Sequence, residues 1–162
     1  MNLNKLFSMQ ETLDKRIETE HNLENENLLH KKVLALFVEI GELANETRCF
    51  KFWSKKGPSS REVILEEYVD GLHFILSIGI TSGFTDISLS SCTNDNKDAT
   101  DGFLRLNSLI STFLNSSTKE NYILLFNCFL NLGDVLGFSE SDIEAAYVHK
   151  NEINHERQNQ GY

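Results

Sequence analysis

Apolar residues recur at spacings of three and four along almost the whole chain, which is the period of an amphipathic helix. The first such stripe covers residues 3–17 and gives way to the polar run EHNLENEN. Two longer and more apolar segments follow, at about residues 28–47 and 60–81. With Pro58 as the one proline, this pattern predicts an all-α protein.

The second half of the chain begins with a segment poor in apolar residues. Residues 86–101 are rich in Ser, Thr, Asn and Asp, which predicts an exposed loop. Helices are then expected at residues 103–115 and 121–136, and a final helix should open at Ser139 or Ser141, since Ser141 and Glu144 have capping-box spacing. We therefore expect one helical domain over residues 1–162, a bundle of about five to seven helices.

Composition narrows the range of partners. The chain has 162 residues, enough for one core, with 24 acidic residues against 15 basic ones and a formal net charge of −9. Such a surface repels phosphate backbones and anionic lipid, so neither nucleic acid nor a membrane is expected as a partner.

The cysteines and the amino terminus bear on the compartment. Cys49, Cys92 and Cys128 are odd in number and form no CxxC motif, which disfavours a disulfide framework and a zinc knuckle. The opening MNLNKLFSMQETLDKR lacks the apolar core of a signal peptide, and the least charged stretch, residues 71–85, is shorter than the ~20 residues that span a bilayer. We expect a cytoplasmic protein.

Two carboxylate pairs lie in the two most apolar segments. VLALFVEIGELA carries Glu39 and Glu42, and VILEEYVDGLHFILSIGI carries Glu67 and Asp70. Residues three apart project to one side of a helix, and buried carboxylates need partners or must take up protons. Mg²⁺ would compensate the charge of these carboxylates, because it prefers oxygen ligands and retains coordination positions for water and phosphates. The alternative is that these acids form a solvated stripe on the helix surface. Glu46 could belong to the outer coordination shell of the metal. Glu66 should be solvated or ion-paired.

Two basic segments are candidates for anion binding. Residues 48–61 hold five of the fifteen basic residues and no acid, although helix-terminal cations on a solvated loop would explain this equally. Near the carboxyl terminus, Lys150, Asn154 and Arg157 share one helical face, which Tyr147 extends by a turn. These groups suit phosphate oxygens, and the alternative is a polar tail that frays in water.

Taken with their flanks, these motifs resemble a known family. Glu39-Ile-Gly-Glu42 followed by Glu67-Tyr-Val-Asp70 is similar to the ExxE…ExxD motif of the all-α nucleoside triphosphate pyrophosphatases, which include MazG-type enzymes and dimeric dUTPases. The D-x-x-H-F-x-L-S sequence at residues 70–77 and the Y-x-x-K-N-x-x-N-x-x-R-Q-x-x-G-Y ending at residues 147–162 resemble the dimeric dUTPases in particular. The resemblance covers roughly residues 3–80 and 143–162.

The resemblance implies a homodimeric enzyme that hydrolyses dUTP, and also dUDP, to dUMP and so limits uracil incorporation into DNA. Two or more Mg²⁺ ions, replaceable by Mn²⁺, would be held by Glu39, Glu42, Glu67 and Asp70. Glu39 and Glu42 would be the catalytic residues, with Glu39 deprotonating the attacking water.

The resemblance also implies a set of substrate contacts. Gln10 stands in the place of a glutamine that reads the uracil, but Asp14 replaces an asparagine found in some members. His73 and Phe74 would lie near the sugar. Without the resemblance, a histidine in so apolar a helix is more often a core residue than a ligand. The predicted substrate-binding residues are Gln10, Trp53, Lys56, His73, Phe74, Tyr147, Lys150, Asn154 and Arg157.

Three other interpretations stay open. A MazG-like pyrophosphatase would act on another or a broader set of nucleotides. A di-iron carboxylate bundle would use the ExxH spacings Glu18–His21 and Glu152–His155, although both segments are polar. A helical interaction protein would keep the scaffold without catalysis.

Overall fold

The computed structural model describes residues 1–89 and 98–161, and this part of the chain holds six helices and no strand. This result confirms the all-α prediction and the expected number of helices. The helices are α1 (Leu3–Glu20), α2 (Leu29–Thr47), α3 (Arg61–Ser82), α4 (Ala99–Asn115), α5 (Lys119–Val135) and α6 (Glu140–Asn159).

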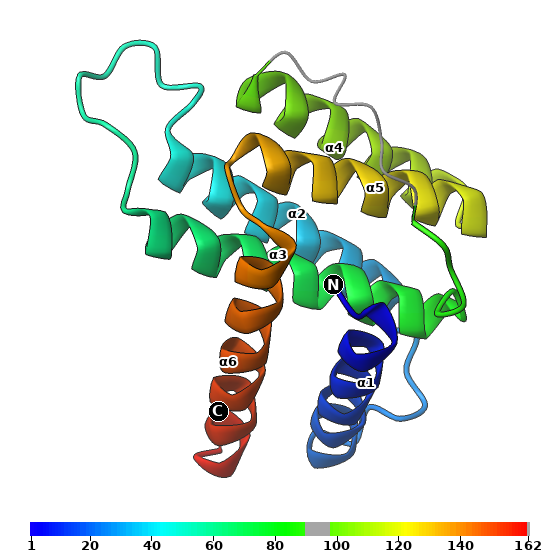
Figure 1. The fold of residues 1–162 in the computed structure, drawn as a ribbon. Helices are drawn as coiled ribbons and strands as arrows, with labels where there is room; N and C mark the ends of the chain where they lie inside the picture. The colour runs from blue at the N-terminus through cyan, green and yellow to red at the C-terminus, as the bar shows by residue number, and fades with distance from the viewer. Residues whose placement is uncertain (90–97, 162) are drawn as a thin grey trace.

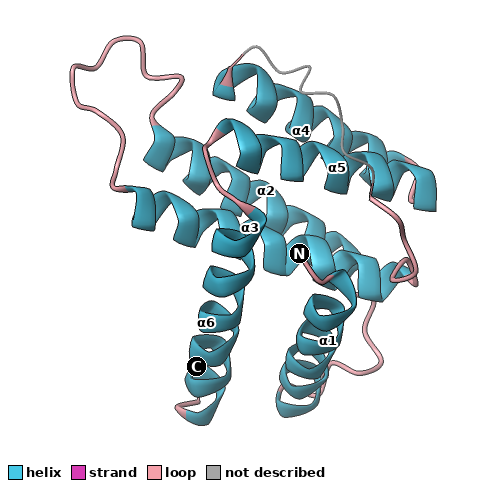
Figure 2. Ribbon diagram, in the orientation of Figure 1, coloured by secondary structure: helices cyan, strands magenta, loops and turns pink. Residues whose placement is uncertain are grey.

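The helices form two groups (Figure 1). α2 and α3 run antiparallel and pack along their length, and the α4–α5 hairpin lies against them. α1 and α6 lie beside each other and cross α3 at a steep angle (Figure 2). Segments from the two ends of the chain therefore meet over the middle of α3.

α3 is the central helix, and its second half is buried almost continuously. Two buried tyrosine hydroxyls anchor it to α5: Tyr68 donates to the carbonyl of Phe129, and Tyr122 donates to the carbonyl of Ile75, each at 3.0 Å. Each hydroxyl lies against a glycine, because a Cβ added at Gly79 would lie 2.2 Å from the Tyr122 oxygen and one at Gly133 would lie 2.6 Å from the Tyr68 oxygen.

One predicted helix start and one predicted capping pair were wrong. α4 begins at Ala99, inside the segment 86–101 expected as a loop, because the Asp98 side chain accepts a hydrogen bond from the amide of Asp101 and caps the helix. Residues 90–97 of that segment lie outside the described residues. In α6 the capping box is formed by Ser139 and Asp142 rather than Ser141 and Glu144.

Glu144 serves another purpose, because it binds α1. Its carboxylate accepts hydrogen bonds from the Lys5 ammonium at 3.0 Å and from the Asn2 amide at 3.1 Å. These contacts fix α1 against α6 and explain why Glu144 is not available for capping.

Two expectations about compartment can be compared with the structure. Neither Cys49 nor Cys128 forms a disulfide, and Cys92 lies outside the described residues. No single helix among the described residues is long and apolar enough to cross a membrane; α5 and α6 pass this test only as a pair, bent by 107°.

Candidate active site

Three carboxylates from α2 and α3 converge where the two helices pack. Glu39 of α2 and Glu67 and Asp70 of α3 each offer an oxygen, and these three oxygens lie within 4.8 Å of one another. All three side chains are half-buried. The i, i+3 spacing in α3 and the antiparallel α2–α3 packing bring the acids together.

Burial and mutual repulsion make this acidic centre electrostatically unfavourable by itself. The pKa of Glu39 is raised to about 7, chiefly by burial and further by the charges of Asp70, Glu42 and Glu67. The pKa values of Glu67 and Asp70 are also raised, again chiefly by burial. A donor set of oxygens alone, with excess negative charge, fits a hard divalent cation of the Mg²⁺ kind.

Glu42, the fourth predicted ligand, is exposed and lies outside the group of three. It is still close enough that its charge raises the pKa values of Glu39 and Glu67. Glu46 accepts a hydrogen bond from the Ser59 hydroxyl, at the base of the loop between α2 and α3.

The Lys150 ammonium lies beside the acidic centre. It is buried and donates to Asp70 and to Glu66, each at 2.8 Å. Burial lowers the pKa of Lys150, but its hydrogen bonds to Asp70 and Glu66 outweigh this and raise the pKa overall. The same contact lowers the pKa of Glu66. Glu66 was expected to be solvated or ion-paired, and it is both exposed and paired with Lys150.

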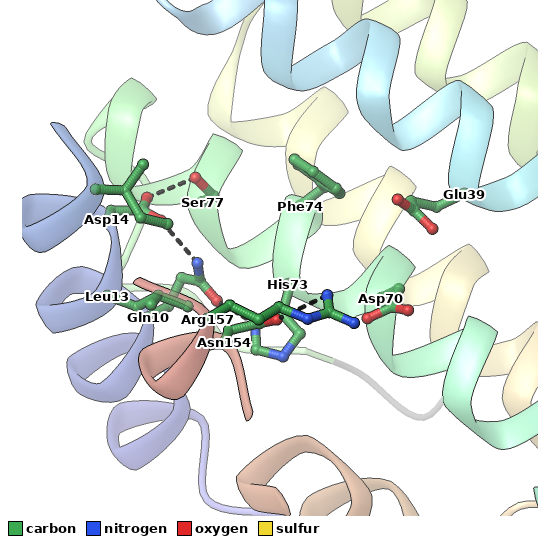
Figure 3. Close-up of a pocket in the computed structure, with 11 residues that line it drawn as sticks. Gln10, Leu13, Asp14, Glu39, Asp70, His73, Phe74, Ser77, Asn154 and Arg157 are labelled. Atoms are coloured by element: carbon green, nitrogen blue, oxygen red, sulfur yellow. Dashed lines mark hydrogen bonds between the residues drawn. The ribbon is translucent and has the colours of Figure 1, made fainter. Parts of the chain in front are cut away.

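A cavity of about 330 Å³ opens next to the carboxylates, between α1, α2, α3 and α6 (Figure 3). Gln10 and Asp14 lie at one side of it, and Glu39 and Asp70 lie at the other. The lining residues are Gln10, Leu13, Asp14, Ile17, Glu39, Asp70, His73, Phe74, Ser77, Asn154 and Arg157. Its volume and its mixed lining are typical of a small-molecule site.

Gln10 is held by three hydrogen bonds. Its amide oxygen accepts from the Tyr147 hydroxyl and from Nδ1 of His73, both at 2.8 Å, and its amide nitrogen donates to Asp14 at 2.7 Å. The His73 ring stacks on Tyr147 with centroids 4.3 Å apart. Burial lowers the pKa of His73 to about 3, so the ring is neutral with its proton on Nδ1.

Sequence reasoning missed the environment of Asp14. Its carboxylate also accepts from the Ser77 hydroxyl and from the Lys32 ammonium, the latter at 3.2 Å. The i, i+4 spacing of Gln10 and Asp14 was a usable signal, but Lys32 could not be identified because it comes from another helix.

The remaining predicted contacts divide into two groups. Phe74, Asn154 and Arg157 line the cavity, and Arg157 lies 3.5 Å from the Asn154 oxygen. Trp53 and Lys56 do not line it, because both are exposed on the loop between α2 and α3.

The ExxH spacings are not arranged as a metal site. Glu18 lies 3.2 Å from the Lys32 ammonium, and the His155 ring lies beside Arg16. Within the described residues, the group of acids, histidines and cysteines close enough to hold an ion consists of Glu39, Glu67 and Asp70. The structure thus gives the di-iron interpretation no support.

The fold and the site define an all-α protein with a centre of three converging carboxylates beside a small-molecule cavity. A family model described as dUTPase matches residues 2–162, nearly the whole chain. The chain therefore belongs to the dimeric all-α dUTPase family, and it is a nucleotide pyrophosphohydrolase that hydrolyses dUTP. A search of the curated proteins found no match.

Proposed function

We propose that this protein is a Mg²⁺-dependent dUTP diphosphatase that converts dUTP to dUMP and pyrophosphate and also accepts dUDP. The observation that carries the proposal is the convergence of Glu39, Glu67 and Asp70 within 4.8 Å beside the cavity. In a cell, this activity would limit uracil incorporation into DNA.

The carboxylates have two proposed roles. Glu39, Glu67 and Asp70 would hold Mg²⁺ with help from the exposed Glu42, and Mn²⁺ could replace it. Two or more bound ions would neutralise the negative charge of the phosphates. Glu39 would also accept a proton from the attacking water, a role supported by its position at the cavity and its pKa near neutrality.

The cavity suggests how the nucleotide would lie. Gln10 would contact the base, while His73 and Phe74 would pack near the sugar, where a ring against C2′ would disfavour a ribonucleotide. Asn154 and Arg157 line the cavity and could contact the phosphates, for which the planar fork of arginine is suited.

Four predicted contacts need separate comment. Tyr147 would act by holding Gln10, and Lys150 by neutralising Asp70 next to the phosphates. For Trp53 and Lys56, the support is the resemblance of the sequence alone, because neither lines the cavity.

A homodimer in the cytoplasm is also proposed. Exposed apolar side chains on the outer face of α2, Leu34 at 65% and Val38 at 50%, offer surface that a second copy could cover. Light scattering after gel filtration tests this; a monomer at micromolar concentration would contradict it.

The activity is tested by measuring pyrophosphate release from each common deoxynucleoside triphosphate in the presence of Mg²⁺. We expect dUTP to be preferred. Preference for dTTP or a purine nucleotide would point to MazG-like specificity, and release from none of them would favour the non-catalytic interpretation.

A further inference from the structure

A buried line of polar side chains leads from α2 into the cavity. The Lys32 ammonium of α2 lies 3.2 Å from Asp14 of α1, and Asp14 in turn accepts from the amide nitrogen of Gln10 at 2.7 Å. The side chains of Lys32 and Asp14 are only 12% and 10% exposed. Ser77 of α3 donates to the same Asp14 oxygen as Lys32. Three helices thus contribute to one ion-paired carboxylate behind the cavity.

This arrangement fixes the orientation of the Gln10 amide. An ionised carboxylate only accepts hydrogen bonds, so Asp14 requires the amide nitrogen of Gln10 on its side. On the other side, Tyr147 and His73 both donate to the amide oxygen. Turning the amide over would place oxygen against the Asp14 carboxylate and nitrogen against two donors, which is unfavourable in a buried site.

One hydrogen-bonding group of the Gln10 amide is then left for a ligand. The oxygen accepts two hydrogen bonds, and one of the two N–H groups donates to Asp14. Within the described part of the chain, the second N–H has no partner, and Gln10 lines the cavity. A ligand atom placed against it must accept a hydrogen bond.

We propose that Lys32 and Asp14 are positioning residues that set base preference by locking Gln10 as a hydrogen-bond donor to a carbonyl oxygen. The inference rests on the proposed function, because it takes the cavity to be the nucleotide site. Both bases carry a carbonyl oxygen at C2, but at C4 uracil carries a carbonyl oxygen and cytosine an amino group. The proposal therefore places the locked N–H against C4, where it favours uracil and meets another donor in cytosine. A buried donor facing a donor leaves both unpaired, which is how polar sites reject near-isosteres.

The experiment compares the binding of dUMP and dCMP by calorimetry in the presence of Mg²⁺. For the unmodified protein we expect dUMP to bind at least about tenfold more tightly than dCMP. Lys32→Met removes the charge that holds Asp14, so the preference for dUMP over dCMP should fall through weaker dUMP binding. Tyr147 and His73 still hold the Gln10 oxygen in this variant, so part of the preference should remain. Lys32→Arg keeps the charge and should keep most of the preference.

The matched control is Lys31→Met, since Lys31 is the neighbouring residue, is exposed and pairs with Glu26 outside the cavity. This variant should keep the full preference. If Lys32→Met does not fold, Asp14→Asn provides the second variant. An asparagine can present either oxygen or nitrogen to Gln10, so it removes the lock on this side of the amide. The Lys32 ammonium keeps Glu18 as its partner, and the preference for dUMP should again fall.

The outcomes separate the inference from the proposed function. The inference is overturned if Lys32→Met or Asp14→Asn leaves the ratio of dUMP to dCMP affinity unchanged. The ion pair would then be purely structural, even if the melting temperature fell. Equal binding of dUMP and dCMP by the unmodified protein would also overturn it. Failure to bind dUMP, together with no pyrophosphate release from dUTP, would instead contradict the proposed function.

Discussion

Lys150 of α6 and Asp70 of α3 form an ion pair, with the lysine Nζ 2.8 Å from the aspartate Oδ2. The lysine side chain is 8% exposed and the aspartate 21%. This contact joins the last helix of the chain to the acidic centre. It holds one positive charge next to three carboxylates before any cation binds.

Replacing Lys150 with methionine should therefore destabilise the protein. Removing one partner of a buried pair leaves an uncompensated charge, which costs about 3 kcal/mol of unfolding free energy. Urea denaturation measures this loss. Lys15→Met is the control, because Lys15 forms an exposed pair with Glu11 and its loss should cost less than about 0.5 kcal/mol. Equal effects of the two changes would contradict the burial argument.

Glu39→Gln and Asp70→Asn should each lower the rate of pyrophosphate release by about 100-fold or more, because each removes a negative oxygen from the acidic centre. Helical content by circular dichroism should not change. Glu62→Gln changes an exposed acid in the first turn of α3 and should leave the rate within about twofold. Full activity in Asp70→Asn would mean that the acidic centre is not the metal site.

Stability without metal should depend on pH. The ordinary pKa of a glutamate side chain is 4.5, and that of Glu39 is about 7 in the folded protein, so folding favours the protonated form. The stability from this protonation is fully present below about pH 4.5 and is lost as the pH rises to about 7. The raised pKa values of Glu67 and Asp70 act in the same direction. The lowered pKa of His73 acts in the opposite direction, because its neutral form is favoured by folding and stability is lost as the pH falls below about 6.5.

The melting temperature in EDTA should therefore be lower at about pH 8 than at about pH 5. Added Mg²⁺ should raise it more at the higher pH, because the carboxylates are ionised there. Glu39→Gln keeps His73 and should reduce the loss between the two pH values. An equal change with pH in Glu39→Gln and in the unmodified protein would argue against the raised pKa of Glu39.

Gly79→Ala should destabilise the core. The added Cβ would lie 2.2 Å from the hydroxyl of Tyr122, which is fully buried and donates to the Ile75 carbonyl. We expect a loss of about 2 kcal/mol in urea denaturation, as for other overpacked sites. Gly41→Ala is the control, because its Cβ would meet no atom within 4 Å and the change should stabilise α2 by up to about 1 kcal/mol.

The helices and the acidic motifs could be predicted because their signals are local. The apolar period placed α2 and α3 within about one residue of their observed bounds, and the i, i+3 spacing put each acidic pair on one side of its helix. The helix α6 starts at one of its two predicted positions, with Ser139 as the cap, but its capping pair was misjudged. Ser139 formed the capping box, while Glu144, the partner expected for Ser141, pairs with Lys5.

By itself, the sequence determined an all-α chain with the motifs of the dUTPase family, because helical period and motif spacing are properties of neighbouring residues. The tertiary structure alone decided which acids converge, leaving Glu42 exposed, and placed Lys150 on Asp70. It also gave Asp14 a partner in Lys32. These contacts depend on how α1, α2 and α6 pack against α3, which is set by core packing between residues far apart along the chain.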